Sequence, residues 1–475
     1  MRIDSMKRLV IYFHYDAQGS LDGPCRFAIA ALRRNADLVL VTNGILTEES
    51  RAWVRQKNLR LMERENNGFD VGAYREALLS LGQDVVCCYE ELVLMNYTLA
   101  GPVCSLAAMW EHMERRQDLD FWGLTRHYAM HSRRFGGTVP EHLQSHFLAV
   151  RKRMFGSPDF WEYWQTMKLP RSYEESVIRH ETRFTGYFAE RGYRWDSYVQ
   201  TDDLKPVFIN PIMACPKELL EERCCPFFKR RSFFTPYLDE LRRTDGNAAA
   251  ELYAYLQSKT SYPVEALVRS LLRTQPLSAL CQNLHWHYVV AEKDNTQETD
   301  LQKQGLRLVR FVPFESEPVT DWYLRKSAQC AEGRLAEAAS LFAEKPLLGV
   351  LSPALPLWPK ALQTVKSRWH ADRSLLDKKL SVPLGNDPPP APHAGWALVR
   401  SDAFPQGVPI VEQEIDCWLL PLIAQQNGYY SATFESVGQA AARAEYGDVY
   451  IQASAEPAAV AKQLGRLVKH KLKKG

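Results

Sequence analysis

Short apolar runs alternate with helix-like segments along the first half of the chain. Residues 8–15 (RLVIYFHY) and 37–42 (DLVLVT) are runs of aliphatic, β-branched and aromatic residues, the pattern of buried strands. Strands that alternate with helices indicate βαβ units and a mostly parallel sheet, so the predicted fold class is α/β. The other strands predicted in this half are 59–62, 92–95, 120–125 and 147–150, and the helices are 25–34, 48–57, one ending at 81, 158–167 and 173–191.

A similar order of elements reappears after residue 284. HAGWALVRSDAF (393–404) follows the pattern of HLQSHFLAVRKRMF (142–155), and in both halves a helix, a Gly-Tyr pair and a strand come next. We interpret this as a degenerate internal duplication; alternatively, any two α/β domains can share such an order. The predicted domains are a first α/β domain at 1–235, a helical connector at 236–283, a second α/β domain at 284–450 and a tail at 451–475.

The net charge is only +3, from 59 basic and 56 acidic residues. This balance argues against a general nucleic-acid binder, which usually shows a strongly basic surface. The positive charge is concentrated in residues 451–475, where six Lys and Arg stand against one acidic residue. Apolar residues recur at helical spacing there, so we predict a basic amphipathic helix that docks on an anionic membrane surface. The alternatives are a helix packed on the domain and a frayed terminus.

Cysteine usage and hydropathy indicate the compartment. The 10 cysteines are scattered without a Cys-x-x-Cys motif, the first residues do not resemble a secretion signal, and no run of 18 apolar residues is present. These features predict a cytoplasmic protein with free thiols. Docking of the tail would make it peripheral on the inner face of the plasma membrane.

The segment 65–74 (ENNGFDVGAY) is the most unusual one in the chain. It follows a predicted strand and opens a helix, at the end of the sheet where α/β proteins bind ligands. Its two glycines would let the backbone approach a ligand closely, and Asp70 could accept hydrogen bonds from a base or ribose. A helix cap formed by Asn67 or Asp70 is the structural alternative, but a cap accounts for one polar residue only.

Several ordered motifs carry a family resemblance. Together with segment 65–74, they make the chain similar to the rhamnan synthesis protein F family over about residues 8–240, and more weakly over 284–435. That family comprises bacterial glycosyltransferases that build rhamnose-containing cell-wall polysaccharides and O-antigens. The motifs are NYTLAGP (96–102), DFWGLT (120–125), HLQSHF (142–147), HETRFT (180–185) and CPFFKR (225–230).

The resemblance implies a GT-A fold, which is a Rossmann-like domain that binds a nucleotide sugar. It also implies an enzyme that transfers a sugar, L-rhamnose from dTDP-rhamnose, to a lipid-linked glycan with inversion. The second α/β domain lacks an equivalent of segment 65–74 and is expected to scaffold or to bind acceptor. The implied donor-binding residues are Asn66, Gly68, Asp70, Gly72, Tyr74, Asn96, Thr98, Lys229 and Arg230.

GT-A enzymes usually carry a D-x-D motif at the strand end that here reads LMNYT (94–98). Two carboxylates there would hold Mg²⁺ or Mn²⁺ against the donor diphosphate. Because Asn96-Tyr97-Thr98 contains no carboxylate, we assign no metal ligand. Lys229 and Arg230 would neutralise the leaving diphosphate instead, unless they form an ordinary solvated basic cluster with Arg231.

Inverting transfer needs one general base, which takes the proton of the acceptor hydroxyl. Likeness to the inverting GT-A enzymes makes Glu181 the candidate, with Asp202 and Asp203 in reserve. A solvated helix face is the alternative for Glu181. The residues predicted to bind sugar or acceptor hydroxyls are His142, Gln144 and Ser145.

A second class of function stays open, that of a non-catalytic glycan-binding or assembly subunit with a degenerate transferase fold. The missing carboxylates at 96–98 favour it, whereas the intact segment 65–74 and Glu181 oppose it. Three tryptophans in the first half could stack on sugars or pack in the core, namely Trp122, Trp161 and Trp164.

Overall fold

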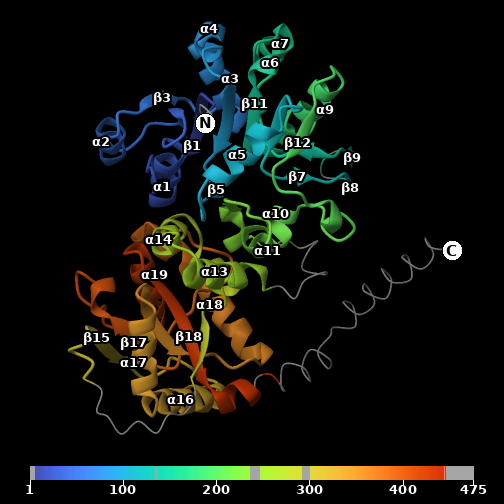
Figure 1. The fold of residues 1–475 in the computed structure, drawn as a ribbon. Helices are drawn as coiled ribbons and strands as arrows, with labels where there is room; N and C mark the ends of the chain where they lie inside the picture. Colours follow the sequence, from blue (N-terminus) through green and yellow to red (C-terminus); the bar gives the residue numbers. More distant parts are fainter. Residues whose placement is uncertain are drawn as a thin grey trace, which may run out of the picture. The chain divides into compact units, whose positions relative to one another are not determined.

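The computed structural model describes residues 6–133, 135, 137–235, 247–290, 300–442 and 444. The chain divides into two compact units, Met1–Ser270 and Leu271–Gly475 (Figure 1). The boundary lies inside the segment 236–283 that was expected to be a connector. The described part of this segment is helical, but one helix belongs to the first unit, one to the second, and one contains the boundary. The helices are α13 (Ala248–Lys259), α14 (Val264–Thr274), which contains the boundary, and α15 (Leu277–Asn283).

A seven-stranded sheet in the order β12-β6-β11-β4-β1-β2-β3 forms the centre of the first unit (Figure 1). Strands β1 to β4 run parallel, β12 is parallel to β6, and β11 is antiparallel to both neighbours. The α/β class with a mostly parallel sheet is therefore confirmed. The strands are β1 (Arg8–Tyr15), β2 (Asp37–Asn43), β3 (Arg60–Arg64), β4 (Glu91–Asn96), β6 (Phe121–Gly123), β11 (Phe147–Arg151) and β12 (Trp195–Ser197).

Polar N-caps determine where several helices of this unit begin. The side chains of Asp22, Thr47, Ser157 and Ser172 each accept a hydrogen bond from a backbone N–H in the first helical turn. The helices are α1 (Gly23–Leu32), α2 (Glu48–Gln56), α3 (Phe69–Leu81), α4 (Gln83–Val86), α5 (Ala107–Arg115), α6 (Lys152–Phe155), α7 (Pro158–Thr166), α8 (Tyr173–Ser176), α9 (Thr182–Ala189), α10 (Pro211–Ala214) and α11 (Pro216–Glu221), with the helical turns η1 (Val177–Glu181), η2 (Asp202–Leu204) and η3 (Arg230–Phe233).

The core of the first unit lies between its sheet and the helices α3, α7 and α9. Buried residues of β1 and β4 pack against the inner side of α3 and against aromatic residues of α7 and α9. Such close packing of large apolar side chains supplies most of the stability of the unit. The three tryptophans that could have stacked on sugars are buried in this unit and are therefore not available to a ligand in this conformation, namely Trp122, Trp161 and Trp164.

The second unit has a five-stranded sheet in the order β14-β18-β16-β17-β15. No helix in the described part of the chain is both long and apolar enough to cross a membrane. The strands are β14 (His287–Val290), β15 (Leu306–Arg310), β16 (Leu348–Pro353), β17 (Trp396–Arg400) and β18 (Tyr430–Ser436). The helices are α16 (Pro318–Glu332), α17 (Leu335–Glu344), α18 (Pro359–Lys379) and α19 (Leu419–Gln426), with the turns η4 (Ser401–Ala403) and η5 (Glu414–Trp418).

Part of the second sheet repeats the topology of the first. In the first sheet, β4 is antiparallel to β11, β11 is antiparallel to β6, and β6 is parallel to β12. The series β15, β17, β16 and β18 has the same directions and the same order along the chain. The match ends there, because β14 lies beside β18 and does not take the place of β1. The shared series supports the proposed duplication for these four strands.

Candidate active site

Two carboxylates from distant parts of the chain share one hydroxyl group. Ser145, just before β11, places its Oγ 2.6 Å from Glu181 Oε2 and 3.3 Å from Asp70 Oδ2. Asn96, at the end of β4, donates from Nδ2 to the same oxygen of Asp70 at 2.9 Å. The site thus forms where the end of β4, the start of α3, the segment before β11 and η1 converge. Four of the predicted residues, Asp70, Asn96, Ser145 and Glu181, are brought together there.

Glu181 is held by backbone as well as by side chains. The backbone N–H of Ser145 donates to Oε2 at 3.2 Å, and Nε2 of His142 lies 3.6 Å from Oε1. Nδ1 of His142 lies 2.7 Å from the carbonyl oxygen of Pro140 and donates to it, so Nε2 is the nitrogen that faces Glu181. Glu181 ends the π-helical turn η1, a kind of distortion that often marks functional sites.

Lys229 brings a positive charge to this group. It lies on the short strand β13 (Phe228–Lys229), which pairs with β5 (Leu99–Ala100), and its Nζ donates to Thr98 Oγ1 at 3.2 Å. The backbone N–H of Thr98 donates in turn to Asn96 Oδ1 at 3.1 Å. The predicted residues Lys229, Thr98 and Asn96 therefore form a chain of hydrogen bonds that ends at Asp70.

The charges in the site shift one another's pKa values. Burial alone would raise the pKa of Glu181, but the neighbouring His142 imidazole, the hydrogen bond from Ser145 and the charge of Lys229 hold it well below its ordinary range. Burial raises the pKa of Asp70, and the charge of Glu181 raises it further. Burial lowers the pKa of Lys229 to about 8, a decrease limited by Glu181 and Asp70. At neutral pH the site therefore contains an ionised Glu181 beside a protonated Lys229.

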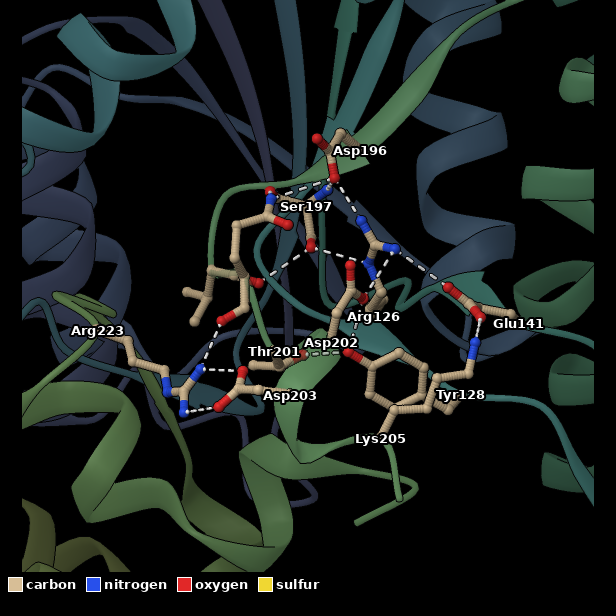
Figure 2. A network of polar contacts seen from close by, with 12 residues as sticks. Arg126, Tyr128, Glu141, Asp196, Ser197, Thr201, Asp202, Asp203, Lys205 and Arg223 are labelled. Carbon is tan, nitrogen blue, oxygen red and sulfur yellow. Dashed lines mark hydrogen bonds and ion pairs between the residues drawn. The ribbon is translucent and has the colours of Figure 1, made fainter. Parts of the chain in front are cut away.

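A second polar network anchors the segment that carries His142 (Figure 2). The guanidinium of Arg126 forms an ion pair with Asp196 and lies 3.1 Å from an oxygen of Glu141. Glu141 also accepts from Lys205 at 2.8 Å. Arg126 lies in β7 (Arg126–His127), which pairs with β10 (His142–Leu143), and the rings of His127 and His142 stack at 5.0 Å. The network therefore fixes the two short strands that present His142 to Glu181.

The two reserve candidates for the base belong to this network and not to the site around Ser145. Both oxygens of Asp203 are bound by Arg223 at 2.7 Å, and Asp202 accepts from the hydroxyl of Tyr128 at 3.2 Å (Figure 2). These contacts give both carboxylates a structural role. Neither Asp202 nor Asp203 is therefore proposed as the general base.

Three predicted binding residues lie elsewhere than expected. The prediction that Arg230 binds the donor diphosphate is not supported, because its guanidinium is already paired with Asp22 and with Ser270. Tyr74 is buried in the core and Gln144 is buried against Thr125, to whose hydroxyl its Oε1 is bound at 2.9 Å. These two side chains are buried and cannot contact a ligand in this conformation.

The rest of segment 65–74 shapes the turn itself. Gly68 has a φ of +77°, and a Cβ at this position would meet Leu169 at 2.8 Å. A Cβ at Gly72 would meet the carbonyl oxygen of Asn67 at 2.5 Å. The turn and its packing thus explain the two glycines, and their part in donor binding stays a prediction. Asn66 remains exposed and accepts from Asn43 at 2.9 Å.

Asn43 and His127 are not among the predicted residues. Asn43 could have been found from its place, because it ends a parallel strand at the edge of the sheet where ligands bind. The stacking of His127 on His142 depends on the pairing of β7 with β10, for which the sequence between them contains no clear signal.

The donor groups in the site do not fit a D-x-D metal centre. No group of three or more His, Cys, Asp and Glu side chains among the described residues is arranged to hold a metal ion. Asn96, which stands at the strand end, contributes an amide that is already bound to Asp70. Carboxylates at that strand end would be needed to place Mg²⁺ or Mn²⁺ against a diphosphate.

Comparison with known proteins gives one family match. A family model described as rhamnan synthesis protein F matches residues 38–312. A curated relative, the uncharacterized protein y4gN of Sinorhizobium fredii, is 23% identical over 203 residues, which are 42% of this chain and 51% of the relative. The chain thus spans about half the length of the curated relative that it matches.

Solved structures with partial similarity include one synthase and two glycosyltransferases. The 4-diphosphocytidyl-2C-methyl-D-erythritol synthase of Anaerococcus prevotii is 10% identical, with a TM-score of 0.27 over 41% of this chain and 89% of that chain. The mannosyltransferase Ktr4p of S. cerevisiae with GDP is 8% identical, with a TM-score of 0.26 over 40% and 69%. Mouse xyloside xylosyltransferase 1 is 10% identical, with a TM-score of 0.26 over 43% and 92%. Scores this low carry no functional inference.

Proposed function

Because the chain belongs to the rhamnan synthesis protein F family, we propose that it is an inverting glycosyltransferase of bacterial polysaccharide synthesis. The proposed donor is dTDP-L-rhamnose and the proposed acceptor is a lipid-linked glycan. The observation that supports a transferase most directly is the sharing of the Ser145 hydroxyl by Asp70 and Glu181, within electrostatic reach of Lys229. Such a group can accept a proton and also stabilise a leaving diphosphate.

In the proposed reaction, the acceptor hydroxyl oxygen attacks the anomeric carbon while the bond from that carbon to the donor diphosphate breaks. Attack and departure on opposite faces invert the anomeric centre. The hydroxyl proton passes to the carboxylate of Glu181, whose side chain keeps 22% of its surface exposed and can be reached by a substrate. The ammonium group of Lys229 balances the negative charge that develops on the diphosphate.

Asp70 is a second candidate for the base. A carboxylate with a low pKa stays ionised but accepts a proton weakly, so the raised pKa of Asp70 makes it the stronger base of the two. However, both of its oxygens already accept hydrogen bonds, one from the backbone N–H of Val71 and the other from Asn96 and Ser145. Within the described part of the chain, Oε1 of Glu181 has only the longer contact of 3.6 Å to Nε2 of His142. Glu181 therefore remains the proposed base, with Asp70 as a residue that positions Ser145 and Asn96.

Turnover of dTDP-L-rhamnose by the purified chain, with a lipid-linked acceptor and with or without EDTA, tests this proposal. We expect transfer to survive chelation, because Asn96-Tyr97-Thr98 offers no carboxylate to a metal ion. Absence of turnover with every donor and acceptor pair would favour the non-catalytic glycan-binding or assembly subunit. Complete loss in EDTA, restored by Mn²⁺, would show that other acids such as Asp70 hold a metal.

The charge of Lys229 is expected to make donor binding depend on pH. Its pKa of about 8 means that the side chain is a cation below that pH and neutral above it, so donor affinity should fall as pH rises through about 8. Lys229→Met should weaken binding about tenfold or more, since a hydrogen bond to a charged group contributes about 1.5–3 kcal/mol, and should remove this pH dependence. Calorimetric titration with dTDP from about pH 6.5 to about pH 9.5 measures both effects.

Lys217→Met is the matched control, because Lys217 is a partly exposed lysine on α11 that pairs with Glu221 at 3.8 Å. It should leave the affinity and its pH dependence unchanged. A wild-type affinity that is constant across this pH range would contradict the proposed role of Lys229.

The predicted basic tail at 451–475 lies outside the described residues, so its docking on the inner membrane surface remains a proposal. Each basic residue near an anionic surface contributes about 1 kcal/mol of binding. In a flotation experiment with anionic vesicles at low salt, the full chain should therefore float with the vesicles. A truncated chain that lacks residues 458–475 should not. Equal recovery of the two chains would contradict the proposal.

A further inference from the structure

Phe69, the first residue of α3, has a backbone conformation that aromatic residues rarely adopt. Its φ is +54°, in the left-handed region, and it follows Gly68, whose φ is +77°. Glycine enters this region without steric cost, whereas a Cβ makes it unfavourable, and for a bulky residue it is an outlier. A phenylalanine at this position therefore costs the fold some stability, which raises the question of what the aromatic ring contributes in return.

Hydrogen bonds from the ends of two strands hold the turn in this conformation. Nδ2 of Asn43, the last residue of β2, donates to Oδ1 of Asn66 at 2.9 Å and to the carbonyl oxygen of Phe69 at 3.4 Å. Nη2 of Arg64, the last residue of β3, donates to the carbonyl oxygen of Asn67 at 2.8 Å. The surrounding structure thus imposes the conformation of Phe69. Unfavourable conformations that are imposed in this way cluster at functional sites.

Packing does not explain the aromatic side chain. Phe69 is 37% exposed, whereas Tyr74, further along the same helix, is buried in the core of the first unit. Phe69 does not belong to that core, and no contact with another ring engages it within the described part of the chain. A smaller residue would therefore serve the fold equally well at this position.

The chain on both sides of Phe69 carries polar groups of the candidate active site. Asp70, the next residue, is held there by Asn96 and Ser145. Asn66, before Phe69, is exposed, and its bond from Asn43 uses only the oxygen of its amide. The amide nitrogen of Asn66 can therefore donate to a ligand, and the exposed ring of Phe69 offers a flat face beside it. A nucleobase combines a flat face with polar edges and matches these groups.

We propose that Phe69 belongs to the donor site and that its ring stacks on the base of the donor nucleotide. Stacking accounts for an aromatic residue at a position where the backbone favours glycine and where the core does not need a large side chain. The stability lost in the turn is then the cost of affinity for the nucleotide. This inference rests on the proposed function, which takes the donor to be a nucleotide sugar.

Calorimetric titration of the full chain with dTDP and with pyrophosphate tests this proposal, because pyrophosphate has the two phosphates but no base. Phe69→Ala should weaken the binding of dTDP about tenfold or more, the usual effect of losing a ring that stacks on a base. It should leave the affinity for pyrophosphate unchanged. Phe69→Tyr keeps the flat face and should bind dTDP like the wild type.

Phe69→Gly separates the role of the ring from the stability of the turn. Both Phe69→Gly and Phe69→Ala lack the ring, so both should bind dTDP equally weakly. Glycine relieves the left-handed backbone and alanine does not, so the first unit of Phe69→Gly should melt about 2–4 °C higher than that of Phe69→Ala. If the ring acted only through the fold, the more stable variant would bind dTDP more tightly, and that result would overturn the inference.

Trp322→Ala is the matched control, because Trp322 is an exposed aromatic residue on α16 of the second unit and should not affect the binding of dTDP. Binding of dTDP that Phe69→Ala leaves unchanged would overturn the inference and leave the proposed donor intact. Equal losses for dTDP and pyrophosphate would also overturn it, since the ring would then only shape the turn. A wild type that binds neither probe would overturn the proposed donor and the inference with it.

Discussion

Replacing Glu181 with Gln is expected to lower the rate of sugar transfer by about 10²–10⁴-fold, the usual contribution of a general base. The amide keeps the size of the side chain and can still accept from Ser145, so the site should stay assembled. It cannot take the proton of the acceptor hydroxyl. The loss should therefore appear in kcat, with little change in the KM for the donor.

The measurement is steady-state transfer from dTDP-L-rhamnose by wild type and variant, with nucleotide affinity determined separately by calorimetry. Glu190→Gln is the matched control, because Glu190 is an exposed glutamate just after α9 and should keep full activity. Asp70→Asn distinguishes the two carboxylates. The base would be Asp70 if two results came together: a loss of about 10²–10⁴-fold in Asp70→Asn, and a rate within about threefold of wild type in Glu181→Gln.

Replacing Glu91 with Ala is expected to destabilise the first unit by about 3–5 kcal/mol, because it leaves buried positive charges without their partner. Glu91 is fully buried at the start of β4. Its carboxylate accepts from Arg8 at 2.7 Å and from the indole of Trp122 at 2.8 Å, and Arg151 lies 3.2 Å away. Arg8 would retain only Glu114, and Arg151 would lose its carboxylate partner.

Thermal unfolding followed by calorimetry measures this loss, and the transition of the first unit is identified as the one that dTDP shifts upward. Glu111→Ala is the control, because the pair Glu111–Arg115 is exposed and should contribute less than about 1 kcal/mol. Equal melting temperatures for Glu91→Ala and wild type would show that the buried cluster is not needed for stability.

The sequence alone determined the class of fold and most of its strands. The apolar runs at 8–15 and 37–42 become β1 and β2 because a central parallel strand must be apolar on both faces. Among the candidates, Asp70 lies in the turn at 65–74, Asn96 at a strand end and Ser145 just before a strand. Glu181 was a candidate from family likeness.

Only the tertiary structure decided which of these residues meet. Ser145 reaches Asp70 across 75 residues and Glu181 across 36, a convergence that depends on the order of strands in the sheet. Family likeness assigned Arg230 to the donor together with Lys229, but Asp22, 208 residues earlier, binds its guanidinium. The two neighbours diverge because their side chains leave the backbone in different directions.

In the second unit, too, the sequence predicted the order of elements but not which side chains meet. The sequence suggested a repeat, and the strand directions of four elements support it. Because the second half lacks an equivalent of segment 65–74, the expectation was that it scaffolds or binds acceptor. Arg368 of α18 meets Glu414 of η5 and Glu315 of a loop, three segments that no local pattern connects. Periodicity and caps depend on neighbours in the chain and can be inferred from sequence. A binding site depends on contacts between distant segments, which form only when the sheet assembles.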